Sequence, residues 1–341
     1  MGGRDDDEPV WREFGNQDRI GLVALELVGK IEFTLTDREL TIQLKRTTKW
    51  DLMKQLAPPR LIGIDAIDSA DDVVLFVHGL EGGQATFAAA AEMLQEREIA
   101  SMRFDYPNDG PPDEIGRRLA EQLTAFTDKH PDTNIHLVAH SLGGLISTWA
   151  VTEDGFPARH VRNVFALGTP FLGSALAEFH DELELFDVVY RLASGTPGAL
   201  NTIADGRGEA AVALKPDSRF LIQLHARNRP TGIRFHLAAG TKSFLSDSQR
   251  DQLIAKLPRE LARLAVSTSY ASRIDKLLAA DELHGGLGDG AVTVQSALGL
   301  PNPASTKTFP LNHTALVSAA EPLEWVLEVS GLAEPAKPLA K

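Results

Sequence analysis

Short apolar runs alternate with helix-like segments over most of the chain. Mostly apolar runs with the length of buried strands lie at 73–77, 99–104, 135–139, 161–167 and 233–239. Between the first four, the segments 84–97, 113–129 and 142–152 carry apolar residues at helical spacing. A last strand is expected at 306–311. This alternation predicts an α/β fold, with a mostly parallel central sheet and helices on both faces.

The first 70 residues follow another pattern. Apolar and polar residues alternate over 31–44 about a T-D-R-E turn, which predicts an antiparallel β-hairpin with one solvated face. Pro58 and Pro59 then interrupt the chain before a short apolar segment at 60–67. We therefore expect an N-terminal extension over 1–70, which either begins the main sheet or forms a small module beside it.

Two segments interrupt the alternation within the main domain, expected over 71–330. Residues about 174–229 include an amphipathic stretch at 178–190 and predict a helical cap or lid, or else simple packing against the core. A second helical insertion over 247–282 is expected to form part of a pocket wall or a subunit contact. The Pro-, Ala- and Lys-rich residues 331–341 predict a flexible tail.

Composition narrows the classes of function. The 341 residues carry a formal net charge of -13, which argues against a nucleic-acid partner because phosphate binding needs a basic face. The chain has no cysteine, which excludes disulfides, thiol catalysis and Cys-ligated metals. No apolar segment near the start resembles a secretory signal, and no run is long enough for a membrane helix. A cytoplasmic protein is expected, with its oligomeric state left open.

The segment V-A-H-S-L-G-G-L-I at 138–146 holds the first candidate for chemistry. Ser141 directly follows the predicted strand at 135–139 and precedes a predicted helix, the setting of a nucleophile elbow. The usual G-x-S-x-G pattern places small residues on both sides because strand and helix approach closely. Here Ala139 takes the first position, while Gly143 and Gly144 supply the second. The alternative is an ordinary serine between a strand and a helix.

A serine nucleophile needs a base and an acid that orients the base. In this arrangement the acid and the histidine come later in the chain, on loops after later strands. Asp289 lies in the glycine-rich segment 285–294, and His313 follows the expected last strand. The rivals are Asp247 and Asp275 for the acid, which lack that glycine-rich setting, and His284 for the base.

An oxyanion hole requires two backbone N–H groups. Leu142, directly after the serine, is expected to supply one, and Leu80 in V-H-G-L-E-G-G at 77–83 the other. His78 and His140 are expected to shape these turns by hydrogen bonds and not to form a metal pair. No cofactor or metal is expected: the glycines near Asp289 lack dinucleotide-loop spacing, and no cluster of oxygen ligands for calcium is visible.

Five ordered motifs carry a resemblance to a known family: V-H-G-L, A-H-S-L-G-G, L-G-T-P-F-L-G-S at 167–174, G-D-G-A-V and the later N-H. Over about 72–317 the chain resembles α/β-hydrolases of the lipase and esterase branch, which includes triacylglycerol lipases, lecithin:cholesterol acyltransferases and GPI inositol deacylases. The resemblance implies that residues of the L-G-T-P-x-x-G segment, which follows the strand after the nucleophile helix, border the acyl pocket. In this sequence those residues are Thr169, Pro170, Phe171 and Leu172.

The sequence therefore predicts a serine esterase that cleaves a small-molecule or lipid ester. Its expected machinery is Ser141, His313 and Asp289, with an oxyanion hole at Leu80 and Leu142. An acyltransferase, thioesterase or amidase would use the same triad, because acceptor choice depends on pocket shape and water exclusion. A non-catalytic scaffold of the same fold is the remaining alternative.

Overall fold

The computed structural model describes residues 28–36, 39–47, 58–64, 70–80, 82–83, 85–107, 110–179, 209–252, 254–255 and 268–333. The chain divides into two compact units, Met1–Pro58 and Pro59–Lys341. In the first unit, strands β1 (Val28–Thr36) and β2 (Glu39–Thr47) pair antiparallel and form their own two-stranded sheet. The predicted hairpin is thus present, and it does not begin the main sheet. Most of the predicted cap segment, at 180–208, lies outside the described residues.

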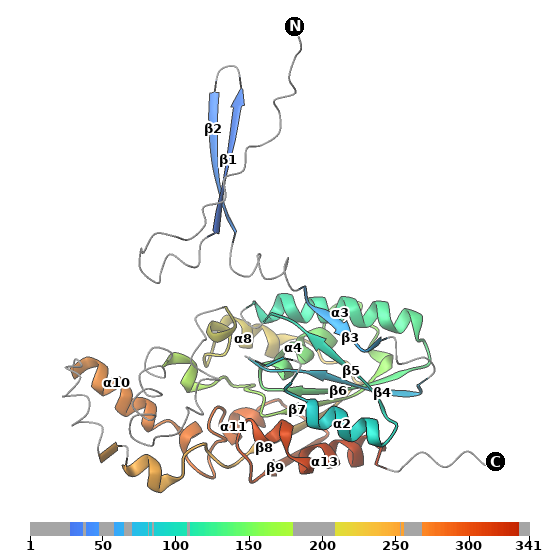
Figure 1. Cartoon of the computed structure of the whole chain (residues 1–341), viewed down its shortest axis with the longest axis vertical. Helices are drawn as coiled ribbons and strands as arrows, with labels where there is room; N and C mark the ends of the chain where they lie inside the picture. The colour runs from blue at the N-terminus through green and yellow to red at the C-terminus, as the bar shows by residue number, and fades with distance from the viewer. Residues whose placement is uncertain are drawn as a thin grey trace. The chain divides into compact units, whose positions relative to one another are not determined.

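The second unit is built on a single large sheet (Figure 1). Its described strands lie in the order β3-β5-β4-β6-β7-β8-β9, and only the edge strand β3 is antiparallel to its neighbour. Their bounds are β3 Arg60–Ile62, β4 Asp72–Val77, β5 Ala100–Asp105, β6 Asn134–His140, β7 Val161–Leu167, β8 Arg234–Gly240 and β9 Ser305–Phe309. The prediction of a mostly parallel sheet is confirmed. Strand β9 ends at Phe309, earlier than predicted, because Pro310 has no N–H for the ladder.

Helices cover both faces of this sheet, as predicted (Figure 1). One face carries α3 (Pro112–Lys129), α4 (Leu142–Val151) and α8 (Arg219–Ala226); the other carries α2 (Ala88–Glu96), α12 (Ala315–Ser318) and α13 (Ala320–Ser330). The remaining helices are α7 Glu209–Ala213, α10 Thr268–Leu278, α11 Val294–Ala297 and the 3-10 turns η3 Ala158–His160, η4 Ala175–Glu178 and η5 Asp281–Leu283.

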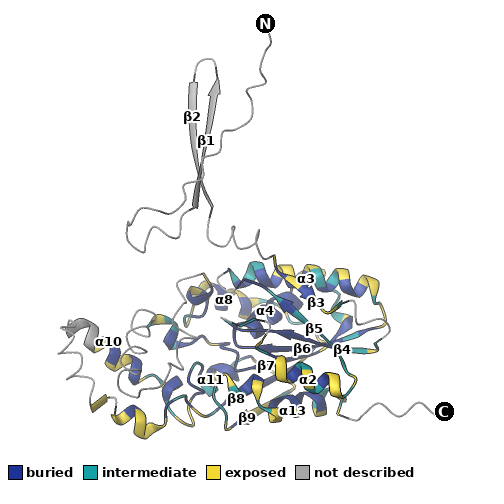
Figure 2. Cartoon of the chain, in the orientation of Figure 1, coloured by how far each residue is buried: buried dark blue, intermediate teal, exposed yellow. Residues whose placement is uncertain are grey.

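Sequence periodicity explains how the two faces are buried (Figure 2). In β4 the alternate residues Val74 and Phe76 face the α2, α12 and α13 layer, where they join a core containing Phe165 and Trp325. Helix α3 begins at Pro112 and buries apolar residues at helical spacing, whereas α4 is buried along its whole length. A fully buried α4 fixes the end of β6, and therefore the turn between them, inside the protein.

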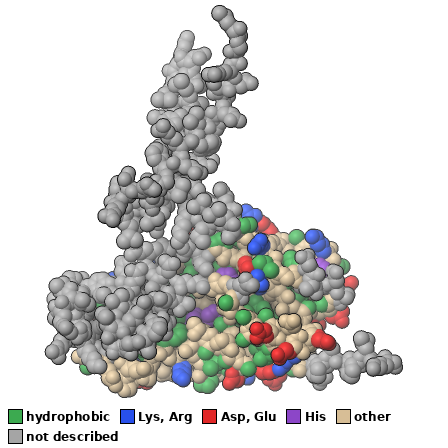
Figure 3. Space-filling model, viewed as in Figure 1, with side chains coloured by type: hydrophobic (Ala, Val, Ile, Leu, Met, Phe, Trp, Pro, Cys, Tyr) green, Lys and Arg blue, Asp and Glu red, His purple; other side chains and the backbone are tan. Residues whose placement is uncertain are grey.

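Charged side chains of both signs lie on the described surface. On the described face in Figure 3, Lys and Arg side chains lie scattered among acidic and neutral ones. Within the described part of the chain, no helix is both long and apolar enough to cross a membrane.

Candidate active site

Ser141 occupies a strained turn between β6 and α4. Its backbone has φ 53° and ψ -126°, a region that non-glycine residues rarely adopt. A Cβ on Gly79 would lie 2.7 Å from the Cβ of Ser141, and one on Gly143 would lie 2.3 Å from the carbonyl oxygen of His78. The small residues of the motif are therefore required by close backbone approach, and the turn presents Ser141 at the carboxyl end of the sheet.

Asp289 and His313 are held together by two hydrogen bonds. The His313 Nδ1 donates to Asp289 Oδ2 at 2.8 Å, and the backbone N–H of His313 donates to the Asp289 carbonyl at 2.9 Å. Asp289 is fully buried, and its Oδ1 accepts the backbone N–H groups of Ala291 and Val292 at 3.0 and 2.8 Å. One carboxylate oxygen is therefore held by backbone N–H groups of its own loop, and the other oxygen orients the imidazole of His313.

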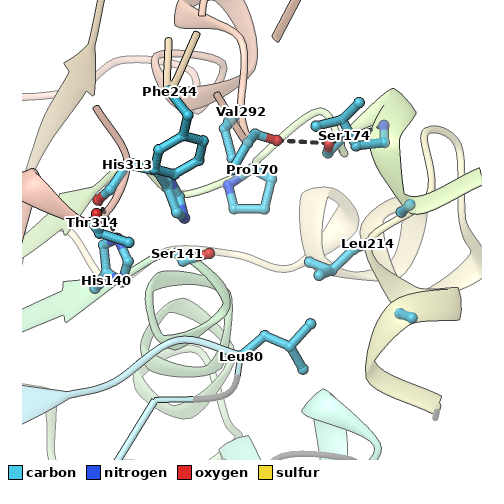
Figure 4. A pocket seen from close by; sticks show the side chains of 14 residues that line it. Leu80, His140, Ser141, Pro170, Ser174, Leu214, Phe244, Val292, His313 and Thr314 are labelled. Carbon is cyan, nitrogen blue, oxygen red and sulfur yellow. Dashed lines mark hydrogen bonds between the residues drawn. The ribbon is translucent and has the colours of Figure 1, made fainter. Parts of the chain in front are cut away.

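Ser141 and His313 face the same cavity (Figure 4). Because Asp289 occupies Nδ1, the other ring nitrogen of His313 is free for exchange with a group in the cavity. The Ser141 hydroxyl points into the cavity and makes no hydrogen bond within the described residues. The described lining contains no Asp, Glu, Lys or Arg. Most of it is formed by apolar side chains, namely Leu80, Pro170, Leu176, Ala177, Ala211, Leu214, Phe244, Ala291 and Val292.

The two predicted oxyanion-hole residues flank Ser141. Leu80 lines the cavity just after β4, in a turn closed by a 3.0 Å hydrogen bond from Gly82 N to the Gly79 carbonyl. Leu142 is the first residue of α4, so its N–H has no intrahelical acceptor. Both backbone segments therefore reach the serine turn from different elements.

Two buried histidines support this arrangement, as the sequence suggested. His140 Nε2 donates to the His313 carbonyl at 2.9 Å, and the two rings lie 4.5 Å apart. Burial lowers the pKa of His140 well below its ordinary value. The Nδ1 of His78 donates to the Gly79 carbonyl at 2.9 Å, and the His78 ring stacks on the Tyr106 ring. Within the residues that can be described, no group of three or more His, Asp or Glu side chains is arranged to hold a metal ion.

The rival residues of the sequence analysis lie elsewhere. Asp247 is exposed and paired with Arg250 at 2.9 Å, and Asp275 is exposed on α10. His284 makes no hydrogen bond to Asp289, and its Nε2 is buried without a partner in the described structure. The structure therefore brings together Ser141 and His313 at the cavity with Asp289 behind them.

Of the four residues predicted to bind substrate, only Pro170 lines the cavity. Thr169 and Phe171 are fully buried, with Thr169 packed against Gly144. Leu172 is 42% exposed and packs on Gly299. The reason is local: after Gly168 the chain turns sharply, so adjacent residues of one motif point in different directions.

Most of the cavity wall carries no recognisable signal in the sequence. Phe244 follows β8, Val292 follows Asp289, Leu176 lies on η4 and Leu214 follows α7. Each comes from a different segment, and single apolar residues in such segments carry no signal that distinguishes a cavity from the core. The one available signal was proximity to Asp289, which could have pointed to Val292.

Comparisons with known proteins agree on the fold. A model of the family described as alpha/beta hydrolase fold matches residues 72–221. The mature form of the Bacillus licheniformis lipase BlEst2 is 21% identical with a TM-score of 0.51, covering 76% of this chain and 91% of the lipase. Its propeptide form is also 21% identical, with a TM-score of 0.51. That match covers 80% of this chain and 53%, about half, of the longer propeptide chain. No curated protein sequence matches this chain significantly.

Proposed function

We propose that this chain, whose residues 72–221 match a model of the alpha/beta hydrolase fold family, is a serine hydrolase that cleaves carboxylic esters through an acyl-enzyme. The observation that carries the proposal is the pair of hydrogen bonds joining Asp289 to His313 beside a serine on a strained strand-to-helix turn. A serine hydroxyl is a weak nucleophile near neutral pH, and this arrangement supplies its base.

In the proposed reaction, His313 takes the hydroxyl proton of Ser141 through its free ring nitrogen while the serine oxygen attacks the ester carbonyl carbon. Collapse of the tetrahedral intermediate breaks the bond to the alcohol, which receives the proton from His313. Water then repeats the sequence on the acyl-enzyme, releasing the acid and restoring Ser141. Asp289 holds His313 with Nδ1 protonated and stabilises the imidazolium.

The N–H groups of Leu80 and Leu142 would hold the oxyanion of the tetrahedral intermediate. Such preorganised donors act where negative charge develops, and each commonly contributes several kcal/mol to the transition state. The N-terminal end of α4 adds a favourable dipole at the same place.

The cavity favours a substrate with an apolar acyl group. Its described lining is mostly apolar and carries no Asp, Glu, Lys or Arg, so an ionised substituent would be buried there without a partner. We extend the proposal to medium-length acyl chains in preference to acetyl, with the predicted cap contributing to the entrance. A cytoplasmic location remains part of the proposal. An acyltransferase, thioesterase or amidase would keep the same residues.

The direct test is labelling of the protein with a fluorophosphonate, followed by hydrolysis of p-nitrophenyl esters of increasing acyl length. Ser141→Ala should abolish labelling and lower hydrolysis by about 1000-fold or more while its circular dichroism and melting temperature stay close to wild type. Labelling that persists in folded Ser141→Ala would place the nucleophile elsewhere. A wild-type protein that is folded but neither labelled nor active would favour the scaffold alternative.

A further inference from the structure

A buried carboxyl group lies behind the cavity, outside the proposed catalytic machinery. Glu282, in η5, is 3% exposed. Within the described residues no salt bridge joins it to a cation. An ionisable side chain in such a place is unfavourable unless hydrogen bonds compensate, so its partners indicate what it does.

The two ends of Glu282 contact two different walls of the cavity. Its side-chain Oε1 accepts the backbone N–H of Ala175 at 2.7 Å and lies 3.4 Å from the hydroxyl of Ser174. Its backbone carbonyl accepts the N–H of Gly290 at 2.8 Å, directly after Asp289. The side chain thus binds the first residues of the predicted cap segment, and the backbone binds the loop of the proposed acid.

A second bond joins the same two walls. The hydroxyl of Ser174 donates to the carbonyl of Ala291 at 2.8 Å, the dashed contact in Figure 4. Ser174, Leu176 and Ala177 line the cavity from one segment, and Ala291 and Val292 line it from the adjacent Asp289 loop. The relative position of these two segments sets the shape of the wall that an acyl group would contact.

The backbone of Glu282 packs directly against the loop before Asp289. A Cβ on Gly288 would lie 2.5 Å from the Glu282 Cα, so the two backbone segments are in close contact. Removal of the side chain would leave this backbone packing and the bond to Gly290 intact. The side-chain links to the Ala175 N–H and to the Ser174 hydroxyl would be lost.

We propose that Glu282 is a positioning residue that fixes the shape of the acyl cavity by tying the Ser174–Ala177 wall to the Asp289 loop, an inference that rests on the proposed ester hydrolysis. It touches neither substrate nor the reacting atoms. Its role is selectivity among acyl groups, whereas Asp289 and His313 carry the chemistry.

The test separates the shape of the cavity from the chemistry. Steady-state kinetics would be measured with p-nitrophenyl acetate and p-nitrophenyl octanoate, alongside the rate of inactivation by a small fluorophosphonate. Glu282→Ala should change the octanoate-to-acetate ratio of kcat/KM by about threefold or more, mainly through KM for octanoate, because a hydrogen bond to a buried carboxylate is lost. Its inactivation rate should stay within about twofold of wild type.

Two further variants and one control make the result decisive. Glu282→Gln should retain the wild-type ratio because the amide oxygen still accepts the Ala175 N–H. Glu282→Leu keeps the volume, removes the buried acid and lacks an acceptor, so it should reproduce the altered ratio even if Glu282→Ala does not fold. Asp281→Asn, at the adjacent exposed acid, should leave the ratio unchanged.

Each outcome has a defined meaning. Wild-type ratios in folded Glu282→Ala or Glu282→Leu would overturn the inference, as would a loss of inactivation rate equal to the loss of ester turnover, which would assign Glu282 to the support of Asp289. If Ser141→Ala keeps full activity, the proposed function itself fails. If hydrolysis depends on Ser141 but not on Glu282, only the inference fails.

Discussion

The ring of His140 donates a 2.9 Å hydrogen bond to the backbone carbonyl of His313, although 173 residues separate them in the chain. His140 immediately precedes Ser141, so this bond ties the nucleophile turn to the loop of the proposed base. Because a carbonyl can only accept, the Nε2 of His140 carries the hydrogen.

The first prediction concerns this bond. His140→Leu should lower kcat for ester hydrolysis by about 10-fold with little change in KM, because the base loop loses its anchor while a leucine of similar size keeps the part of the cavity wall that His140 forms. Steady-state kinetics on a single p-nitrophenyl ester measures both constants. His140→Gln, which retains a donor, should recover much of the activity. Equal kcat values in wild type and folded His140→Leu would show that the bond plays no part in positioning His313.

The second prediction distinguishes the base from its nearby rival. His313→Ala should lower kcat by about 1000-fold, and Asp289→Asn by about 100-fold or more, because an amide at 289 cannot hold the imidazole as the carboxylate does. His284→Ala serves as the matched control, since His284 makes no hydrogen bond to Asp289 in the described structure. A loss in His284→Ala equal to that in His313→Ala would require a different base.

The third prediction concerns packing at the start of α4. A Cβ on Gly144 would lie 1.9 Å from the Oγ1 of the fully buried Thr169, so Gly144→Ala should destabilise the fold by about 1–3 kcal/mol through overpacking. Urea unfolding measures this change. Thr169→Ala removes Oγ1 and Cγ2, the two closest of the clashing atoms, so the double variant should regain much of the lost stability. Additive losses in the double variant would mean that another contact limits the site.

The fourth prediction follows from a buried polar chain across the sheet. His236 Nε2 donates to the Asn163 side-chain oxygen at 3.1 Å, Asn163 donates to His136 Nδ1 at 2.7 Å, and His136 Nε2 donates to Asp72 at 3.0 Å. At the other end, the hydroxyl of Ser305 donates to His236 Nδ1 at 2.8 Å. In this series of hydrogen bonds, each histidine has one ring nitrogen that donates and one that accepts. This pattern requires both histidines to be neutral.

Burial lowers the pKa of His236 to about 4 and also lowers that of His136; nearby Arg234 contributes to both shifts. Since the ordinary value is 6.5, the unfolded chain binds a proton first as the pH falls, and the free energy of unfolding decreases from about pH 6.5 towards pH 4. The slope should approach about 1.4 kcal/mol per pH unit for each proton taken up. His236→Gln keeps a donor and an acceptor without titrating, so it should flatten this slope. An unchanged slope, measured by urea unfolding at several pH values, would assign the acid sensitivity to other groups.

Local sequence patterns determined the elements and their order. Apolar runs of strand length separated by helical periodicity specify a parallel sheet, because each face must be covered by helices. Glycines such as Gly79, Gly143 and Gly144 also indicate, from the sequence alone, where two backbone segments approach closely, because glycine has no Cβ to obstruct the contact. The order of Ser141, Asp289 and His313 along the chain could also be predicted. Each lies on a segment that comes after a strand, and the carboxyl ends of parallel strands meet at one edge of the sheet.

Tertiary packing decided which side chains meet. Within the L-G-T-P-F-L motif, Pro170 reaches the cavity while Thr169 and Phe171 turn into the core, a choice set by the fold of the chain after Gly168. Phe244 and Leu214 reach the cavity from distant segments, and Glu282 joins two of its walls. No hydrophobic periodicity in the sequence predicts these positions. Contacts between residues far apart in sequence depend on how the elements pack, whereas the local pattern determines only which element forms.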